Sequence, residues 1–201
     1  MRLRFSPASP YVRKVMVLAH EAGVADALDL VTTDVWGDTG AYRAVNPLGK
    51  VPALELDDGT VLFDSPVICE YLNAARCKGL FLPSEGTERW AALRLEALAD
   101  GILDASVLQL LESRRDPPQQ SQGWIDRQQS SVDAALGCLE KEADILDDRL
   151  TIGVIAVACA LGYRDFRFPD NDWRGNHARL AAWFARFSER PSMQATLPRN
   201  P

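Results

Sequence analysis

Two short stretches carry residue types suited to hold a small peptide. The segment Asn46-Pro47-Leu48-Gly49-Lys50-Val51-Pro52-Ala53-Leu54 is a turn followed by extended chain, where the main chain of Val51 can pair with a ligand as an added strand. Asp64 and Ser65 stand where a helix is expected to begin, and free N–H groups at a helix start can bind a carboxylate. The pattern predicts a peptide clamp, and Ser9 adds a hydroxyl near the N-terminus.

Composition narrows the functional class. The chain has 201 residues, 47% of them hydrophobic, which is enough for one large domain or two small ones. A net charge of −6 argues against a nucleic-acid partner. The four cysteines form neither a CxxC pair nor a Cys/His cluster, so free thiols are expected and no metal site is predicted.

The start of the chain and its apolar runs bear on localisation. Residues 1–5 lead into turn residues without the apolar region of a signal peptide. The longest uncharged apolar run, residues 150–163, is too short to span a bilayer, so it is predicted to form a core helix. We therefore expect a cytoplasmic protein without a membrane partner.

The first part of the chain shows a βαβαββα pattern. Ser9-Pro10 is typical of a helix start, Gly23 of a helix end and Asp58-Gly59 of a hairpin turn. The expected strands cover 3–6, 28–33, 51–56 and 61–63, the helices cover 9–23, 42–45 and 66–75, and a polar loop covers 36–40. In the last helix Val67, Ile68, Tyr71 and Leu72 are expected to face inward.

After a linker at 77–86 the pattern is helical throughout. Apolar residues from Trp90 to Leu111 follow helical spacing, and Asp116-Pro117-Pro118 ends that helix. Further helices are expected over 124–146, 151–166 and 177–187, with a short one after Arg190. Thr151 is expected to cap the buried helix, although Val154 stands where a capping box has an acid. The predicted domains are 1–76 and 87–201.

These features together resemble the cytosolic glutathione S-transferase family over nearly the whole length. The motifs that carry the resemblance are Ser9-Pro10-Tyr11-Val12-Arg13-Lys14, Asn46 to Leu54, Asp64-Ser65, Thr151 to Ala158 and Arg190-Pro191-Ser192-Met193. The resemblance implies a thioredoxin-like N-terminal α/β domain, an all-α helical-bundle C-terminal domain, a glutathione site and usually a homodimer. Glutathione would be a co-substrate, and no cofactor is expected.

Ser9 is the candidate catalytic residue by resemblance to serine-type members of the family. A hydroxyl that donates a hydrogen bond to the glutathione thiolate favours the charged form, and a helix N-terminus adds to this effect. Each unit by which the thiol pKa falls requires about 1.4 kcal/mol. The alternative is that Ser9 only caps the helix, and Ser6 is a weaker candidate. Serine rather than cysteine favours conjugation or isomerisation over disulfide chemistry.

The resemblance also assigns the clamp. The Val51-Pro52 bond is expected to be cis, with Val51 pairing to the cysteinyl backbone of glutathione. Lys50 would reach the glycine carboxylate, Ser65 the γ-glutamyl carboxylate, and Asp64 would help to hold the amino group. The alternatives are a solvated lysine, a strand-start proline and simple capping of the following helix.

The sequence says least about the second substrate. Trp36, Leu103, Val107 and Tyr163 are candidates to line an apolar electrophile pocket, with core packing as the alternative. The function expected is conjugation of glutathione to a small apolar electrophile. The alternative is a non-catalytic binding or regulatory protein.

Several basic residues have no assigned role. Arg114, Arg115, Arg164 and Arg167 are expected on solvated helix faces or as loop anchors. No role is assigned to Arg13, for which the alternative is a solvated helix residue.

Overall fold

The computed structural model describes residues 1–37 and 39–200 and divides into two compact units. The first unit is Met1–Arg89 together with the segment that begins at Pro191, and the second is Trp90–Arg190. The expected second domain, 87–201, therefore differs from the structure, because the chain returns to the first unit after Arg190. Position 38, in the expected loop 36–40, and position 201 lie outside the described residues.

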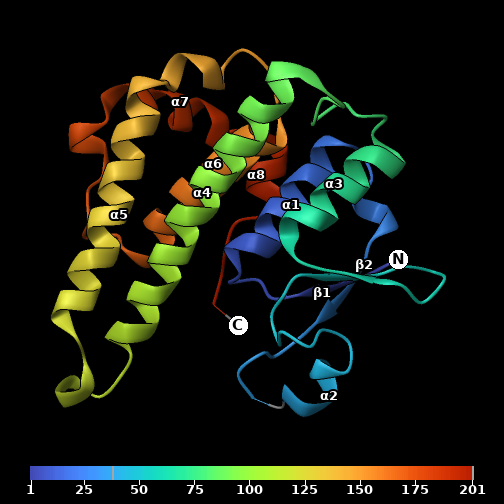
Figure 1. Cartoon of the computed structure of the whole chain (residues 1–201), viewed down its shortest axis with the longest axis horizontal. Helices are drawn as coiled ribbons and strands as arrows, with labels where there is room; N and C mark the ends of the chain where they lie inside the picture. The colour runs from blue at the N-terminus through green and yellow to red at the C-terminus, as the bar shows by residue number, and fades with distance from the viewer. Residues whose placement is uncertain (38, 201) are drawn as a thin grey trace. The chain divides into compact units, whose positions relative to one another are not determined.

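The first unit is built on a four-stranded sheet in the order β2-β1-β3-β4. Strand β1 pairs parallel with β2 and antiparallel with β3, which pairs antiparallel with β4. Helices α1 and α3 pack together on one face, and α2 lies on the opposite side (Figure 1). The elements are β1 (Arg2–Phe5), α1 (Pro10–Glu21), β2 (Asp29–Thr32), α2 (Thr39–Arg43), β3 (Ala53–Glu55), β4 (Val61–Leu62) and α3 (Ser65–Arg76), with a 3-10 turn at Ala25–Ala27.

Local signals set the boundaries of this unit. The Ser9 hydroxyl accepts a hydrogen bond from the Val12 N–H at 3.3 Å, so it caps α1 as expected. Gly23 has a φ of +67°, just after α1 ends, and Gly59 has a φ of +88° in the hairpin turn. Both positions suit glycine because an L side chain rarely adopts this region. The βαβαββα order is confirmed.

The second unit is helical. Its helices are α4 (Gly86–Ser113, which begins in the first unit), α5 (Gln122–Lys141), α6 (Ile152–Arg167) and α7 (Ala178–Ser188), with 3-10 turns at Pro117–Gln119, Ala143–Leu146 and Arg174–Asn176. Helix α8 (Pro191–Ala195) follows in the first unit. A thioredoxin-like unit followed by a helical one confirms the predicted fold class. No helix within the described residues combines the length and apolar character needed to cross a membrane.

Helix α6 is the centre of the helical unit. The Thr151 hydroxyl accepts the Val154 N–H at 3.3 Å, which confirms the predicted cap. All residues from Ile152 to Arg164 are buried. A Cβ on Gly153 would lie 2.3 Å from the Ala92 carbonyl oxygen of α4, so α6 and α4 approach as closely as their backbones allow.

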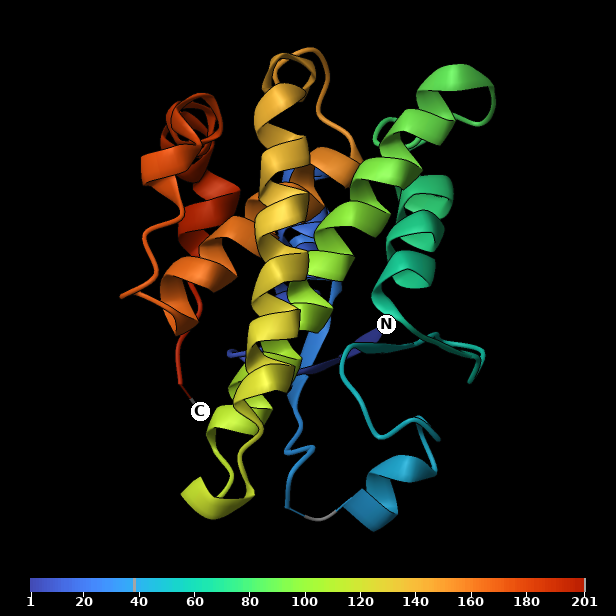
Figure 2. The ribbon, with the colours of Figure 1, turned by 60° about the vertical axis from the view of Figure 1, so that its left-hand side comes forward.

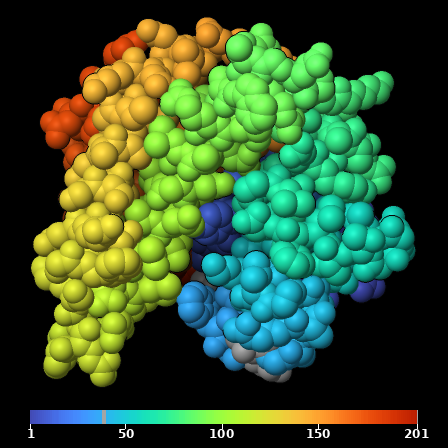
Figure 3. Space-filling view, in the orientation of Figure 1, coloured from blue at the N-terminus to red at the C-terminus, as the bar shows by residue number. Residues whose placement is uncertain are grey.

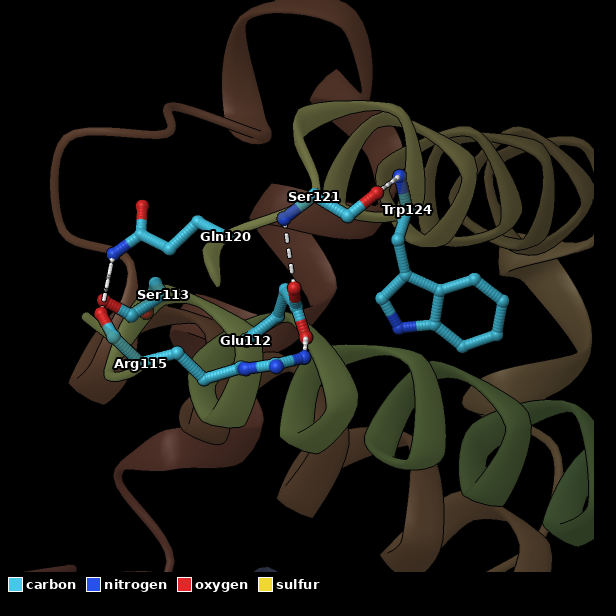
Figure 4. Close-up of polar contacts among 6 residues, drawn as sticks. All are labelled: Glu112, Ser113, Arg115, Gln120, Ser121 and Trp124. Carbon is cyan, nitrogen blue, oxygen red and sulfur yellow. Dashed lines mark hydrogen bonds and ion pairs between the residues drawn. The ribbon is translucent and has the colours of Figure 1, made fainter. Parts of the chain in front are cut away.

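Helices α4 and α5 run side by side in opposite directions, and their connection lies at one end of the unit (Figures 1 and 2). The Glu112 carboxylate accepts the Ser121 N–H at 2.7 Å and pairs with Arg115 at 3.3 Å (Figure 4). The Gln120 amide donates to the carbonyls of Ser113 and Arg115. These contacts tie down a turn that lies at the surface (Figure 3).

For helices α3 and α4, the predicted buried face is wrong in part. Val67 of α3 is 46% exposed rather than facing inward. On α4, Trp90 and Leu108 are exposed, although the apolar spacing placed them on the buried face. The buried face of α4 is instead formed by Ala92, Leu95, Glu96, Ala99, Ile102, Leu103, Ala105, Ser106 and Gln109. This face combines three large apolar residues, Leu95, Ile102 and Leu103, with small and polar ones.

The close approach of α6 to α4 generates a stability prediction. Gly153→Ala forces the new methyl group against the Ala92 carbonyl and the Leu95 side chain, so the free energy of unfolding should fall by about 1–3 kcal/mol. Urea unfolding measures the change. Gly137→Ala on α5 is the matched control, because nothing beyond the nearby backbone of its own helix lies within 4 Å of its Cβ position. The control should be neutral or stabilising by up to about 1 kcal/mol. An unchanged Gly153→Ala protein would contradict the close approach.

Candidate functional site

Strand register brings three predicted site segments to one end of the sheet. Arg4, near the end of β1, pairs with Ala53 at the start of β3. In the hairpin, Leu54 near the start of β3 pairs with Leu62 at the end of β4. The loop to Ser9 leaves β1, the Val51-Pro52 segment enters β3, and Asp64-Ser65 follows β4. All three segments therefore meet at the same sheet end.

The main-chain carbonyl of Lys50 is held by two side chains. The Tyr42 hydroxyl donates to it at 2.7 Å and the Asn46 amide at 2.6 Å. The side-chain amide oxygen of Asn46 in turn accepts the Leu48 N–H at 3.0 Å. Tyr42 and Asn46 are both buried, and burial raises the pKa of the Tyr42 phenol, so it remains a neutral donor. The chain is thereby fixed immediately before Val51.

Val51 is 9% exposed and follows the fixed Lys50 carbonyl directly. The Val51-Pro52 peptide is cis, as expected from the resemblance. Within residues 1–37 and 39–200, the Val51 N–H and C=O make no hydrogen bond. Both groups can therefore pair with an extended ligand, as an edge strand does. The Lys50 side chain is exposed beside them.

Asp64 and Ser65 begin α3 in the expected way. Asp64 occupies the N-cap position, but its exposed carboxylate makes no capping hydrogen bond. The Phe63-Asp64 peptide is also cis. Ser65 is 1% exposed in the first turn, where N–H groups have no acceptor within the helix. The carboxylate of Asp64 is negative, and the start of α3 at Ser65 carries a partial positive charge. Together they suit a ligand group that carries both a positive and a negative charge.

Ser9 combines capping with a remaining donor. Its oxygen accepts the Val12 N–H, and its own N–H donates to the Ser6 carbonyl at 3.1 Å. Accepting a hydrogen bond uses a lone pair and leaves the hydroxyl proton able to donate. Ser9 and Ser6 are both partly exposed. Capping and donation are therefore compatible at Ser9.

The expected electrophile residues fall in different environments. Trp36 belongs to the first unit and is 73% exposed. Leu103 and Val107 lie one turn apart on α4, Leu103 buried and Val107 half-buried, and Tyr163 is buried on α6. The buried state of Leu103 fits the packing alternative, whereas Val107 is accessible in part.

Arginine side chains surround Tyr163. Burial raises the pKa of the Tyr163 phenol, and the positive charges of Arg167, Arg114 and Arg164 act in the opposite direction. The Arg167 guanidinium also stacks 4.1 Å from the centre of the Phe166 ring. This part of the helical unit therefore carries positive charge in a chain that is acidic overall.

Arg164 itself is not solvated, which corrects the sequence expectation. It is 1% exposed, and its guanidinium donates to the Gln109 side chain at 2.8 Å and the Gln129 side chain at 3.0 Å. It also lies 3.9 Å from the centre of the Phe168 ring. Burial lowers the Arg164 pKa to about 10, so it stays charged at neutral pH. It ties α4, α5 and α6 together.

A cavity of about 440 Å³ in the first unit lies beside α2 and the ends of β1 and β2. It includes Tyr42 but none of Ser9, Val51, Asp64 and Ser65, and its lining is Arg4, Thr32, Thr33, Asp34, Ala41, Tyr42 and Val45. Across the part of the chain that the structure describes, no group of three or more His, Cys, Asp or Glu side chains is placed to hold a metal ion.

The sequence predicted the clamp segments but not the two side chains that fix the chain before Val51. Tyr42 was expected only as part of a short helix, and Asn46 only as the start of the turn motif. No local signal identifies them as donors, because the acceptor is a main-chain oxygen eight residues after Tyr42. Arg13, to which the sequence assigns no role, is buried and donates to the Met193 carbonyl.

Comparisons with known proteins show the family of the chain. Residues 8–75 match the glutathione S-transferase N-terminal domain and residues 122–186 the C-terminal domain. The uncharacterized GST-like protein YibF of Escherichia coli K12 is 32% identical over 98% of each chain.

Two solved structures of glutathione transferase family members are similar to this chain over nearly its whole length. A glutathione transferase family member from Pseudomonas fluorescens Pf-5 with bound glutathione is 48% identical, with a TM-score of 0.95 over 98% of each chain. A structure from the same organism with bound S-(propanoic acid)-glutathione is 47% identical, with a TM-score of 0.92 over 99% of this chain and all of the other.

The paired donors on the Lys50 carbonyl generate a test. Tyr42→Phe and Asn46→Ala each remove one donor, so each should lower the free energy of unfolding by about 1 kcal/mol, with additional loss of packing for Asn46→Ala. In the double variant the carbonyl loses both donors, and the two effects should couple by at least about 0.5 kcal/mol. A double-mutant cycle by urea unfolding measures this. Strict additivity would show that the two donors act independently.

Proposed function

Because the chain belongs to the glutathione S-transferase family, we propose that it binds glutathione at the clamp of the first unit and transfers it to a small electrophile. The observation that carries this proposal is the meeting of Ser9, Val51 and Ser65 segments at one end of the sheet. A tripeptide with a thiol in its middle fits an open main-chain edge with a hydroxyl nearby.

Each part of glutathione has a matching group. The open N–H and C=O of Val51 pair with the backbone of the cysteinyl residue. The γ-glutamyl carboxylate lies at Ser65 and the start of α3, while the exposed carboxylate of Asp64 holds the amino group. Lys50, which is exposed, reaches the glycine carboxylate as a mobile charge.

Ser9 then activates the thiol. Its hydroxyl donates to the thiolate and, with the N-terminus of α1, lowers the thiol pKa. The proton leaves to solvent, the sulfur attacks the electrophilic carbon, and the leaving group departs or the adduct takes up a proton. Serine forms no mixed disulfide with glutathione, so conjugation is favoured over thiol reduction.

A non-catalytic glutathione-binding protein is the alternative function. It would share the clamp at Val51, Asp64 and Ser65 but would not depend on the Ser9 hydroxyl. The two functions therefore differ in turnover and in the pKa of the bound thiol.

Ser9→Ala tests the enzyme directly. Without the donated hydrogen bond, the pKa of bound glutathione should rise by about one to two units. The catalytic efficiency with an aryl halide should fall roughly ten- to a hundredfold at neutral pH, because less thiolate is present. Ultraviolet thiolate absorbance and initial rates measure these changes, and calorimetry should show glutathione affinity retained within a few-fold. Ser6→Ala is the matched control. A loss with Ser6→Ala alone would move the role to Ser6, and no turnover in the parent would favour the binding protein.

The second substrate is proposed to be small and apolar in its body, with an acidic group. Val107 on α4 supplies accessible apolar surface, and the arginines around Tyr163 supply positive charge. The related structure from Pseudomonas fluorescens Pf-5 holds a glutathione whose added group carries a carboxylic acid. These observations support an electrophile that bears a carboxylate.

A matched substrate pair tests the acidic group. The protein should prefer 4-chloro-3-nitrobenzoate over the neutral 4-chloro-3-nitrobenzamide once each rate is divided by its uncatalysed rate. Arg167→Gln should reduce this preference by about three- to tenfold while the amide rate changes little, since one charged contact is lost. Arg127→Gln on α5 removes the same charge from an exposed position and serves as control. Equal preference ratios in parent and Arg167→Gln would rule out this role for Arg167.

We also propose that the protein assembles as a homodimer. Val67 is an apolar side chain on α3 that remains 46% exposed, which a partner surface would cover. The family resemblance points to the same assembly, and sedimentation of the purified chain reports its mass.

A further inference from the structure

The last segment of the chain runs along α1, the helix that Ser9 caps. We call Pro191–Asn200 the C-terminal strap. It begins with α8, which packs against α1, and both belong to the first unit. Buried Arg13 of α1 donates to the Met193 carbonyl at 3.1 Å and to the Thr196 hydroxyl at 3.5 Å. Arg13 thus satisfies one carbonyl group in the last turn of α8.

The strap is also fixed at the other end of α1. The Ser192 hydroxyl donates to the Glu21 carboxylate at 2.5 Å, and Glu21 is the last residue of α1. The Thr196 hydroxyl donates to the Ser192 carbonyl at 2.8 Å. The strap is therefore tied to the end of α1 through Glu21 and to its first turns through Arg13.

Beyond Thr196 the strap reaches the loop that precedes Ser9. The Arg199 N–H donates to the Pro7 carbonyl at 3.2 Å. Pro7 stands between Ser6, whose carbonyl accepts the Ser9 N–H, and Ser9 itself. Residues separated by nearly the whole sequence thus hold the short loop on which the catalytic hydroxyl depends.

We propose that the C-terminal strap is a positioning device for Ser9, acting through the bond from Arg199 to Pro7 and the anchor at Arg13. This inference rests on the proposed role of Ser9 at the thiolate. Proline cannot donate at position 7, so the chain between Ser6 and Ser9 has few ways to fix itself. A hydrogen bond to a developing charge requires its donor within a narrow range of distance and angle. The strap restricts the loop to that range.

A purely structural strap makes a different prediction. Loss of the strap would then lower the free energy of unfolding but leave the bound thiol pKa unchanged, because Ser9 would hold its position without help. A positioning strap changes the thiol pKa and kcat in a protein that stays folded, with little effect on KM for glutathione. The thiol pKa is therefore the deciding readout.

The sharpest variant is Arg199→Pro, compared with Arg199→Ala. Proline removes the single N–H that contacts Pro7, whereas alanine keeps it, and the position is exposed, so neither change disturbs the core. Arg199→Pro should raise the bound thiol pKa by about half a unit to one unit and lower kcat about three- to tenfold, as loss of one hydrogen bond would. Arg199→Ala should match the parent. A chain that ends at Pro198 repeats the loss by deletion and should behave like Arg199→Pro.

The outcomes separate the two proposals. If the parent lowers the thiol pKa and all three variants match it, the strap has no positioning role and the inference is overturned. If Arg199→Ala loses as much as Arg199→Pro, the side chain rather than the N–H carries the effect, which also overturns it. If the parent itself does not lower the thiol pKa, the role of Ser9 in the proposed function fails first. The positioning role of the strap is supported if Arg199→Pro and the deletion both raise the bound thiol pKa and lower kcat, while Arg199→Ala does neither.

Discussion

The fixed carbonyl of Lys50 is the constraint on which the N-terminal site depends. An open main-chain edge binds a peptide well only if it is held in the bound geometry beforehand, because ordering it on binding would reduce affinity. Val51 has no partner of its own within the described chain, so its order comes from the residue before it. Tyr42 and Asn46 supply that order with two donors to a single oxygen. Helix α2 and the turn after it therefore act as supports of the binding edge, in addition to covering the sheet.

At Ser9, the proposed chemistry would use the same side chain that caps α1. Capping requires the Ser9 oxygen to accept, and thiolate stabilisation requires its proton to be donated, so the two roles use different parts of the hydroxyl. A hydroxyl that accepts a hydrogen bond is polarised and becomes a better donor. The cap thus strengthens the bond that the thiolate would receive. Such a dual role also explains why capping and catalysis could not be separated from the sequence alone.

What the sequence predicted well was local. Ser9, Gly59 and Thr151 act on neighbouring residues, so their caps and turn, and with them the element order, could be predicted. The failures concern distant partners. Val67 and Trp90 have apolar side chains at helical spacing, yet tertiary packing leaves them exposed. Arg13 and Arg164 are buried because each guanidinium reaches acceptors far along the chain, such as the Met193 carbonyl or the Gln109 amide. Charge alone suggested solvent, and nothing near these residues in sequence indicates the acceptors.

The charge distribution sets a final condition on the second substrate. With a net charge of −6, the chain as a whole repels an acidic molecule, although salt screens that repulsion beyond about 8 Å. A local excess of arginine is therefore needed before an anion can bind, and the helical unit provides one around Tyr163. Buried Arg164 adds charge there without adding an exposed side chain; its hydrogen-bond partners are neutral amides and a hydroxyl, and the Asp133 carboxylate acts on it electrostatically. Under the proposed function, the arginines of the second unit would favour an electrophile that carries a negative charge.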